Sequence, residues 1–183
     1  MATSEEHTTL PLPEFSGPPP TVLIVCAPYY AKIAEDLIRG AMATLNAVGA
    51  QSETIHVPGA LEVPCAIGLA KSRYEGFVAL GCVIRGETTH YDTVCNDSSR
   101  GLTLLGLDGV CIGNGILTCE TMAQAQARAA PDQQNKGGGA AAAALHLVAL
   151  RRRFAAEVHT DGREGTPSGD FLLAGADQTT RPV

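Results

Sequence analysis

The sequence predicts a three-layer α/β sandwich in which helices cover both faces of a four-stranded parallel sheet. Strand-like apolar runs alternate four times with segments of helical periodicity, and this alternation is typical of parallel sheets. The first run, residues 22–26 (VLIVC), is apolar without a break, as expected of a strand buried on both faces. The length of 183 residues fits one such domain with terminal extensions.

The predicted elements follow one another in strand–helix order. Apolar residues at spacings of three and four, from Ala34 to Val48, predict the first helix, and Gly49 ends it. Pro64 is compatible with the second helix because it lies in the first turn. The predicted strands are residues 22–26, 54–57, 77–84 and 110–113, and the predicted helices are residues 34–48, 61–73, 89–107, 120–128 and 137–154.

The domain is expected to span residues 21–158, with a segment outside it at each end. Residues 1–20 hold five prolines and few large apolar side chains, which predicts an extended arm. Residues 159–183 are rich in Gly, Thr, Asp and Ser, a composition that predicts a disordered tail.

Charge and cysteine content argue against several classes of protein. Most of the net charge of −6 lies near the two ends, so the middle of the chain lacks the basic stripe of a nucleic-acid-binding protein. The basic residues 151–153 are interpreted as the end of a helix, where cations offset the helix dipole. Six cysteines without a C-x-x-C pair predict reduced thiols and no metal ligation. With no secretory signal and no membrane-spanning apolar run in the sequence, we expect a soluble, cytoplasmic protein that binds no membrane.

Chemically versatile residues gather after each predicted strand. In parallel sheets, ligands bind at the carboxyl ends of the strands, beside the loops that lead into helices. An aromatic ring, a carboxylate, a hydroxyl-rich turn and a histidine are therefore expected to converge on one pocket. The four segments are residues 27–30 (APYY), 57–62 (VPGALE), 85–92 (RGETTHYD) and 114–118 (NGILT).

The third of these segments carries the most specific chemistry. Gly86 allows close approach of a ligand, Thr88 or Thr89 can cap the following helix, and free amides at a helix start bind anions such as phosphate. Glu87 is expected to turn its side chain away and to offer its backbone amide. His90 lies one turn into the helix, and an imidazole can transfer protons near neutral pH. A lone histidine is more often a surface residue, but the neighbouring threonines and the loop position favour a functional role.

The remaining candidates each have a structural and a functional interpretation. Glu62 is either an ordinary acid in a first helical turn or an acceptor for a polyol or amine. Tyr29 is either a core residue or a platform that stacks on a flat ring. Arg128 can simply offset a helix dipole, and Lys136 can simply be exposed to solvent.

Several blocks of sequence resemble those of the 6,7-dimethyl-8-ribityllumazine synthase family over roughly residues 20–154. The longest and most specific block is residues 81–92 (GCVIRGETTHYD). The others are residues 57–64 (VPGALEVP), residues 115–118 (GILT) followed by Gln124, Ala125 and Arg128, and the weaker block 135–137 (NKG). Their order and spacing match the family along the predicted strand–helix units.

The resemblance implies a flavodoxin-like form of the α/β sandwich and an enzyme of riboflavin biosynthesis. The implied reaction condenses 5-amino-6-(D-ribitylamino)uracil with 3,4-dihydroxy-2-butanone 4-phosphate to give 6,7-dimethyl-8-ribityllumazine, phosphate and water. The family needs neither a metal nor an organic cofactor. Much of the catalysis is expected to come from positioning two bound substrates, with some acid–base assistance.

The resemblance also implies a role for each matched residue. His90 matches the histidine that transfers protons. The pyrimidine and its ribityl chain are expected to contact Tyr29, Ala60, Leu61, Glu62, Cys82, Val83, Ile84 and Asn114, and the butanone phosphate is expected to contact Glu87, Thr88, Arg128 and Lys136.

Family members assemble as pentamers, and some as sixty-subunit shells, with active sites shared between neighbours. We therefore expect a homo-oligomer in which one subunit contributes Tyr29, Glu62 and His90 and its neighbour contributes Asn114 and Arg128. Riboflavin synthase is a further expected partner. A non-catalytic flavin-binding or lumazine-binding protein and a shell-forming protein are the alternatives on the same scaffold, and the pairing of His90 with Arg128 favours the enzyme.

The sequence departs from the family's usual pattern in three places. Residues 28–30 read PYY where the family usually has Arg-Phe-Asn, Asn114 stands where Phe is frequent, and Gly139 replaces an acid that orients the arginine. These departures are expected to lower activity without changing its kind.

Overall fold

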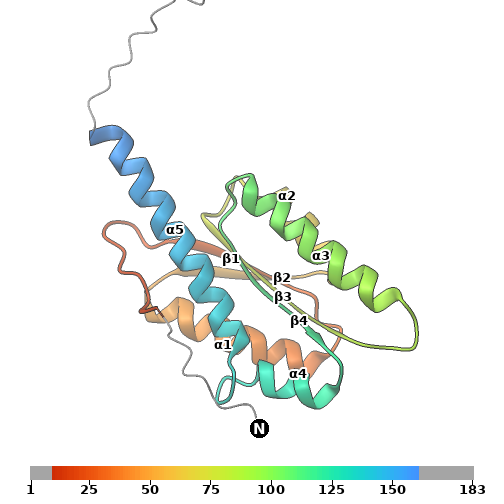
Figure 1. The fold of residues 1–183 in the computed structure, drawn as a ribbon. Coiled ribbons are helices and arrows are strands. Elements are labelled where there is room, and N and C mark those ends of the chain that lie inside the picture. Colours follow the sequence, from red (N-terminus) through yellow and green to blue (C-terminus); the bar gives the residue numbers. More distant parts are fainter. Residues whose placement is uncertain (1–9, 161–183) are drawn as a thin grey trace, which may run out of the picture.

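A computed structural model describes residues 10–160, with side chains as far as residue 157. It confirms the predicted fold class: a four-stranded parallel sheet in the order β2-β1-β3-β4 lies between two layers of helices (Figure 1). The strands are β1 (Thr21–Cys26), β2 (Gln51–His56), β3 (Gly76–Ile84) and β4 (Ile112–Cys119). The helices are α1 (Ala31–Ala47), α2 (Glu62–Ala70), α3 (His90–Leu107), α4 (Met122–Ala129) and α5 (Lys136–Thr160).

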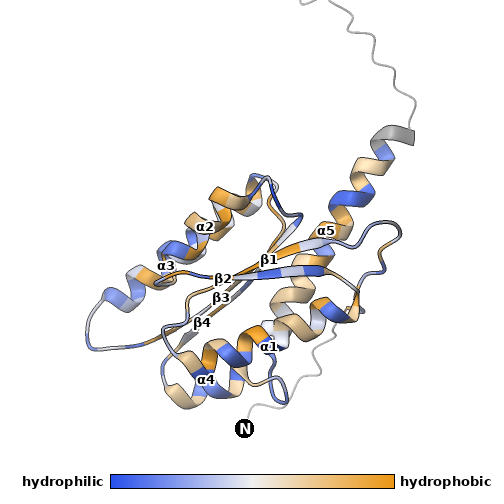
Figure 2. Ribbon diagram, turned by 180° about the vertical axis from the view of Figure 1, so that it is seen from behind, coloured by the Kyte–Doolittle hydropathy of each residue, from blue (hydrophilic) through white to orange (hydrophobic). Residues whose placement is uncertain are grey.

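The two faces of the sheet bury two separate apolar cores. On β1, Val22 and Ile24 face α1, α4 and α5, whereas Leu23 and Val25 face α2 and α3. This alternation explains why the strand is apolar without a break, since successive side chains point to opposite faces and both faces are covered. The edge strand β2 is mostly exposed and hydrophilic (Figure 2).

Small residues let α5 pack closely on β4 and α1. A Cβ atom at Gly113 would overlap the backbone carbonyl of Ala140, and one at Gly137 would overlap the carbonyl of Leu37. Ala141, Ala144 and other buried alanines continue this close contact along α5. The Ala-rich composition of this helix is therefore a packing requirement as well as a favourable helix propensity.

The prediction that the fourth strand ends at residue 113 is wrong. β4 begins at Ile112 and continues to Cys119, so that Asn114 lies within the strand and pairs with Ala79 of β3. Burial alternates along β4 because one face packs on the domain and the other is open, as expected of an edge strand. Gly and Asn are frequent in turns, and this tendency conceals the alternation in the sequence.

Other boundaries differ by a few residues. β2 begins three residues earlier than predicted, and α2 ends at Ala70 rather than at residue 73. The last helix is longer than predicted, because α5 reaches Thr160 and passes the expected domain end at residue 158. Residues 1–9 of the predicted arm and residues 161–183 of the predicted tail lie outside the described residues.

A cluster around Glu75 ties the amino-terminal arm to the domain. Residues 10–20 form no helix or strand, but Leu12 and Phe15 pack against the core that the sheet shares with α1, α4 and α5. Arg152 on α5 donates from Nε and Nη2 to the two carboxylate oxygens of Glu75, at 2.9 and 2.7 Å, and from Nη1 to the carbonyl oxygen of Pro18. These hydrogen bonds, chiefly those from Arg152, hold the pKa of Glu75 below its usual value.

The Glu75 cluster predicts a pH-dependent contribution to stability. A lowered carboxylate pKa stabilises the fold above the unfolded-state value of about 4.5, and this contribution disappears as pH falls through the lower folded-state pKa. We expect Glu75→Gln to reduce the free energy of unfolding at pH 7 by about 1 kcal/mol, because the pair is partly exposed. Urea unfolding at several pH values measures the effect, with the exposed Glu35→Gln as control. If the difference in free energy of unfolding between wild type and Glu75→Gln were the same at pH 3 as at pH 7, this account would be contradicted.

Candidate active site

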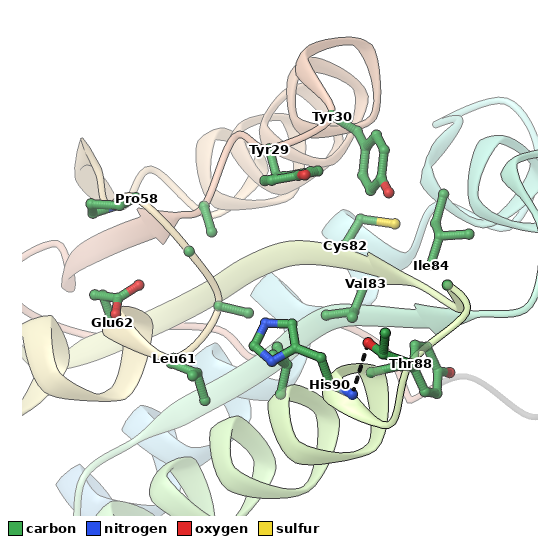
Figure 3. Close-up of a pocket in the computed structure, with 16 residues that line it drawn as sticks. Tyr29, Tyr30, Pro58, Leu61, Glu62, Cys82, Val83, Ile84, Thr88 and His90 are labelled. Atoms are coloured by element: carbon green, nitrogen blue, oxygen red, sulfur yellow. Dashed lines mark hydrogen bonds between the residues drawn. The ribbon is translucent and has the colours of Figure 1, made fainter.

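A cavity of about 470 Å³ opens where β1, β2 and β3 end. The loops that follow these strands form its walls, as the parallel topology requires (Figure 3). The predicted aromatic ring, carboxylate, threonine and histidine all lie along it. Nine of the predicted site residues line the cavity: Tyr29, Ala60, Leu61, Glu62, Cys82, Val83, Ile84, Thr88 and His90.

Four predicted site residues do not line this cavity. Glu87 is exposed in the turn before α3, and Lys136 is exposed at the start of α5. Arg128, half-buried on α4, donates to the carbonyl oxygen of Gln124 in its own helix. Asn114 borders a different hollow, between α3, β4 and α5. A single chain therefore does not bring these four side chains into contact with the cavity.

Two adjacent tyrosines stand on one side of the cavity. Their backbone leaves β1 after Ala27, whose N–H donates to the carbonyl oxygen of Leu80, and Tyr30 then leads directly into α1. The rings of Tyr29 and Tyr30 pack edge to face with centroids 5.0 Å apart. Tyr29 is 76% exposed, so one face of its ring is free to stack on a flat ligand. Burial raises the pKa of Tyr30, which keeps its phenol neutral.

Glu62 lies at the first position of α2, close to the strand end at β2. Its backbone N–H donates to the carbonyl oxygen of Gly59, which closes the turn that precedes the helix. The side chain is exposed, and its carboxylate has no hydrogen-bond partner within the described part of the chain. Both oxygens are therefore free to accept hydrogen bonds from a ligand.

Residues 86–89 form an open turn between β3 and α3. Their backbone N–H groups donate to no acceptor among residues 10–160, so they can bind an anion together with the positive end of the helix dipole. The hydroxyl oxygen of Thr88 accepts a hydrogen bond of 3.4 Å from the N–H of His90. Thr89 occupies the helix cap but makes no such side-chain bond.

His90, the first residue of α3, brings an imidazole into the cavity. Figure 3 shows its ring near Leu61 and Val83, on the far side of the cavity from the tyrosines. The ring is exposed and forms no hydrogen bond within the described residues, so both nitrogen atoms can meet a substrate.

The floor of the cavity comes from the end of β3. Cys82 is buried, and burial raises the pKa of its thiol to about 12, with a further contribution from the neighbouring Cys119. At physiological pH Cys82 is therefore a neutral apolar wall rather than a nucleophile. Val83 and Ile84 extend the same apolar surface toward the mouth.

Several residues that line the cavity were not among the individually predicted site residues. Tyr30, Pro58 and Tyr91 lie within the loop segments that were expected to converge on the pocket, and that position was the only available signal. Val94 lies one helical turn beyond His90, so the helical period would have identified it.

Within residues 10–160, no group of three or more His, Cys, Asp or Glu side chains is arranged to hold a metal ion. None of the described helices combines the length and the apolar character needed to cross a membrane.

The fold and the cavity define an α/β protein that binds a small polar ligand at the carboxyl edge of its sheet. Comparison with known proteins narrows this class. The family model for 6,7-dimethyl-8-ribityllumazine synthase matches residues 19–152, and the chain belongs to this family. It is accordingly a transferase of riboflavin biosynthesis that acts on small molecules.

Relatives named 6,7-dimethyl-8-ribityllumazine synthase match most of the chain. The one from Jannaschia sp. (strain CCS1) is 57% identical over 149 residues, which cover 80% of this chain and 83% of the relative. The one from Novosphingobium aromaticivorans is 53% identical over 135 residues, or 73% of this chain and 97% of the relative. The one from Bartonella tribocorum is 53% identical over 139 residues, or 74% and 92%.

The raised pKa of Cys82 predicts low reactivity toward alkylating agents. At pH 8 we expect iodoacetamide to modify the exposed Cys65 at least about tenfold faster than Cys82, because the thiolate is the reacting form. Peptide mass spectrometry follows each site, and labelling in denaturant is the control, in which the two rates become similar. Equal rates in the folded protein would show that Cys82 is neither buried nor protonated.

Proposed function

We propose that the cavity binds 5-amino-6-(D-ribitylamino)uracil and 3,4-dihydroxy-2-butanone 4-phosphate and condenses them to 6,7-dimethyl-8-ribityllumazine. The observation that carries this proposal is the convergence of Tyr29, Glu62, the open turn 86–89 and His90 on one cavity. Together they offer a surface for a flat ring, an acceptor for hydroxyl groups, an anion site and a proton carrier. These are the four functions that the two substrates require.

The pyrimidine and its side chain would bind along the part of the cavity lined by Tyr29, Glu62 and the end of β3. Tyr29 offers a free ring face for stacking, and Cys82, Val83 and Ile84 offer an apolar wall. The ribityl chain would lie along Ala60 and Leu61 and donate hydroxyl hydrogen bonds to the unpaired carboxylate of Glu62.

The phosphate would be held by the turn before α3. Free backbone amides at residues 86–89, including that of Glu87, supply donors at the positive end of the helix. The Thr88 hydroxyl oxygen already accepts from the N–H of His90, so its own hydrogen is free to donate to a phosphate oxygen. The Glu87 side chain is exposed outside the cavity, which limits its repulsion of the phosphate.

Catalysis then combines positioning with proton transfer. The amine of the pyrimidine attacks the ketone carbonyl, and loss of one water gives an imine. Elimination of phosphate and ring closure with loss of a second water complete the lumazine. The His90 imidazole, close to the phosphate turn, is the group placed to accept and return protons. Holding the two substrates together supplies much of the remaining rate enhancement.

A second copy of the chain would complete the site. Among the described residues, no Arg or Lys side chain lines the cavity, although a phosphate needs compensating charge. We propose that Arg128, Lys136 and Asn114 of a neighbouring subunit supply the missing groups, in a pentamer that can assemble further into a sixty-subunit shell. The exposed side chains of Leu147, Leu150 and Phe154, beside the hollow that contains Asn114, provide apolar surface for such a contact.

The free cysteines support a reducing location for this assembly. All six thiols are unpaired, which fits the proposed cytoplasmic location.

A single assay tests the proposed reaction. Purified protein is mixed with both substrates, and lumazine absorbance is followed against the same mixture without protein. We expect a catalysed rate that saturates with each substrate. A rate no higher than the spontaneous condensation would refute the proposed reaction.

Replacing His90 tests its role in proton transfer. We expect His90→Ala to lower kcat by no more than the 10²–10⁴-fold that general acid–base catalysis usually contributes, because substrate positioning survives. The residual rate should remain above the spontaneous one. His146→Ala, in the middle of α5 and away from the cavity, is the matched control. An unchanged kcat in His90→Ala would remove His90 from the mechanism.

Replacing Arg128 tests the contribution of the neighbouring subunit. We expect Arg128→Ala to raise KM for the butanone phosphate about tenfold or more, since a charged hydrogen bond is worth about 1.5–3 kcal/mol. KM for the pyrimidine should change little. Arg39→Ala on the exposed face of α1 controls for the loss of one positive charge. Unchanged kinetics would exclude Arg128 from the site.

A further inference from the structure

Arg85, the residue that follows β3, joins three elements of the fold beside the cavity. Its backbone N–H donates to the carbonyl oxygen of Cys119 at the end of β4. Its Nε donates to both carboxylate oxygens of Glu120, at 3.1 and 2.9 Å, and its Nη1 donates to Asp92 on α3 at 3.3 Å. The guanidinium carbon also lies 4.0 Å from the ring centroid of Tyr91. The end of β3 is thereby connected to the end of β4 and to the first turn of α3.

The partners of Arg85 are themselves held in place. The backbone N–H of Glu120 donates to the side-chain oxygen of Gln124, and the backbone N–H of Asp92 donates to the carbonyl oxygen of Thr89. Tyr91 lines the cavity next to His90. The guanidinium therefore contacts groups with defined positions directly after β4, in α3 and in the cavity wall.

The turn that these contacts enclose has few restraints of its own. Residues 86–89 are exposed, and no backbone N–H in the turn donates a hydrogen bond within the described part of the chain. Gly86 has open space around its Cα, so packing does not hold it. The turn depends on its two ends, Arg85 and the start of α3, for the direction in which its amides point.

The charge of Arg85 is already compensated. Two carboxylates, those of Glu120 and Asp92, accept hydrogen bonds from its guanidinium, and Arg85 does not line the cavity. A guanidinium paired in this way binds a substrate phosphate poorly. It can instead hold parts of the fold together, because its planar group donates to several acceptors at once.

We propose that Arg85 is a positioning residue for the reaction: it fixes the anion-binding turn 86–89 and the adjacent His90 by tying the start of α3 to the end of β4. The inference rests on the proposed phosphate site at this turn, but it concerns a residue that does not touch the substrate. The planar guanidinium is essential in this role, because it reaches Glu120, Asp92 and the Tyr91 ring together.

The first experiment compares Arg85→Met with Arg100→Met. Arg100 lies on the same helix as His90, pairs within the described residues only with the exposed Asp97 and does not line the cavity, so it controls for lost charge. We expect Arg85→Met to raise KM for the butanone phosphate, and the inhibition constant of inorganic phosphate, about tenfold, because small displacements of positioning groups cost up to about 10²-fold. KM for the pyrimidine should stay within about twofold, since Tyr29 and Glu62 lie on other elements. Kinetics like those of Arg100→Met would overturn the proposal.

A second variant distinguishes whether Arg85 positions the turn or binds phosphate directly, because the two roles predict opposite changes in phosphate binding. Glu120→Met removes the main partner of Arg85. If Arg85 acts through this contact, Glu120→Met weakens phosphate use in the same direction as Arg85→Met. If Arg85 instead binds phosphate directly, freeing its guanidinium strengthens phosphate binding, and that result would overturn the proposal.

A conservative substitution tests whether charge alone is sufficient. We expect Arg85→Lys to behave like Arg85→Met, because an ammonium group lacks the planar fork. Full activity in Arg85→Lys would refute the positioning role.

Hydrogen–deuterium exchange gives a readout that does not depend on catalysis. We expect faster exchange of the hydrogen-bonded amides of Asp92 and Thr93, in the first turn of α3, in Arg85→Met than in wild type, with no change in Arg100→Met. Exchange that is equally slow in all three proteins would overturn the proposal, whichever reaction the protein catalyses. An inactive wild-type enzyme would instead refute the proposed reaction, so the two failures are distinguishable.

Discussion

The parallel pairing of β3 with β1 on one side and β4 on the other sets where the loops of the site lie. Parallel pairing brings the carboxyl ends of neighbouring strands to one edge, and α2 and α3 begin close to that edge. The pairing also requires both faces to be buried, which explains the unbroken apolar run of β1. Parallel strand pairing thus accounts for both the two apolar cores and the position of the cavity.

For the proposed reaction, the cavity of a single chain lacks one kind of group. It has a stacking ring, a free carboxylate, an imidazole and an anion turn, but within the described residues it has no cationic side chain. The three residues proposed to complete it, Asn114, Arg128 and Lys136, lie on β4, α4 and α5. All three elements follow α3 in the sequence. The part of the chain up to the start of α3 therefore builds the cavity, and the part after α3 would complete the cavity of a neighbouring subunit.

The structure shows what two of the departures from the family's usual sequence do to the site. Tyr29 keeps a free ring face for stacking, so its replacement of a phenylalanine preserves that surface. Asn114 instead uses its side-chain oxygen to accept from the N–H of Ile116 within β4. A polar side chain engaged in this way cannot offer the apolar contact of a phenylalanine. Any loss of affinity for the pyrimidine should therefore arise where Asn114 of the neighbouring subunit is proposed to meet the cavity.

Sequence patterns predicted the elements that depend on local periodicity. The continuous apolar character of β1 and β3, and the helical spacing of α1, reflect burial that repeats along the chain. The length of β4 was not predictable in this way, because Gly113 and Gly115 are small for contact with α5 and resemble turn residues in the sequence. The contact between Arg85 and Glu120 joins residues 35 positions apart and depends on the β3–β4 register, which no local pattern encodes.

In the proposed assembly, one active site is built from two copies of the chain. Mixing the two impaired variants, His90→Ala and Arg128→Ala, after dissociation and reassembly together, tests it most directly at a butanone phosphate concentration below KM. In a mixed assembly, some contacts join an intact His90 side to an intact Arg128 side, so lumazine synthesis should recover well above the activity of either variant alone. If reassembled mixtures are no more active than the separate variants, the two residues act in the same subunit or not at all, and the shared site is contradicted.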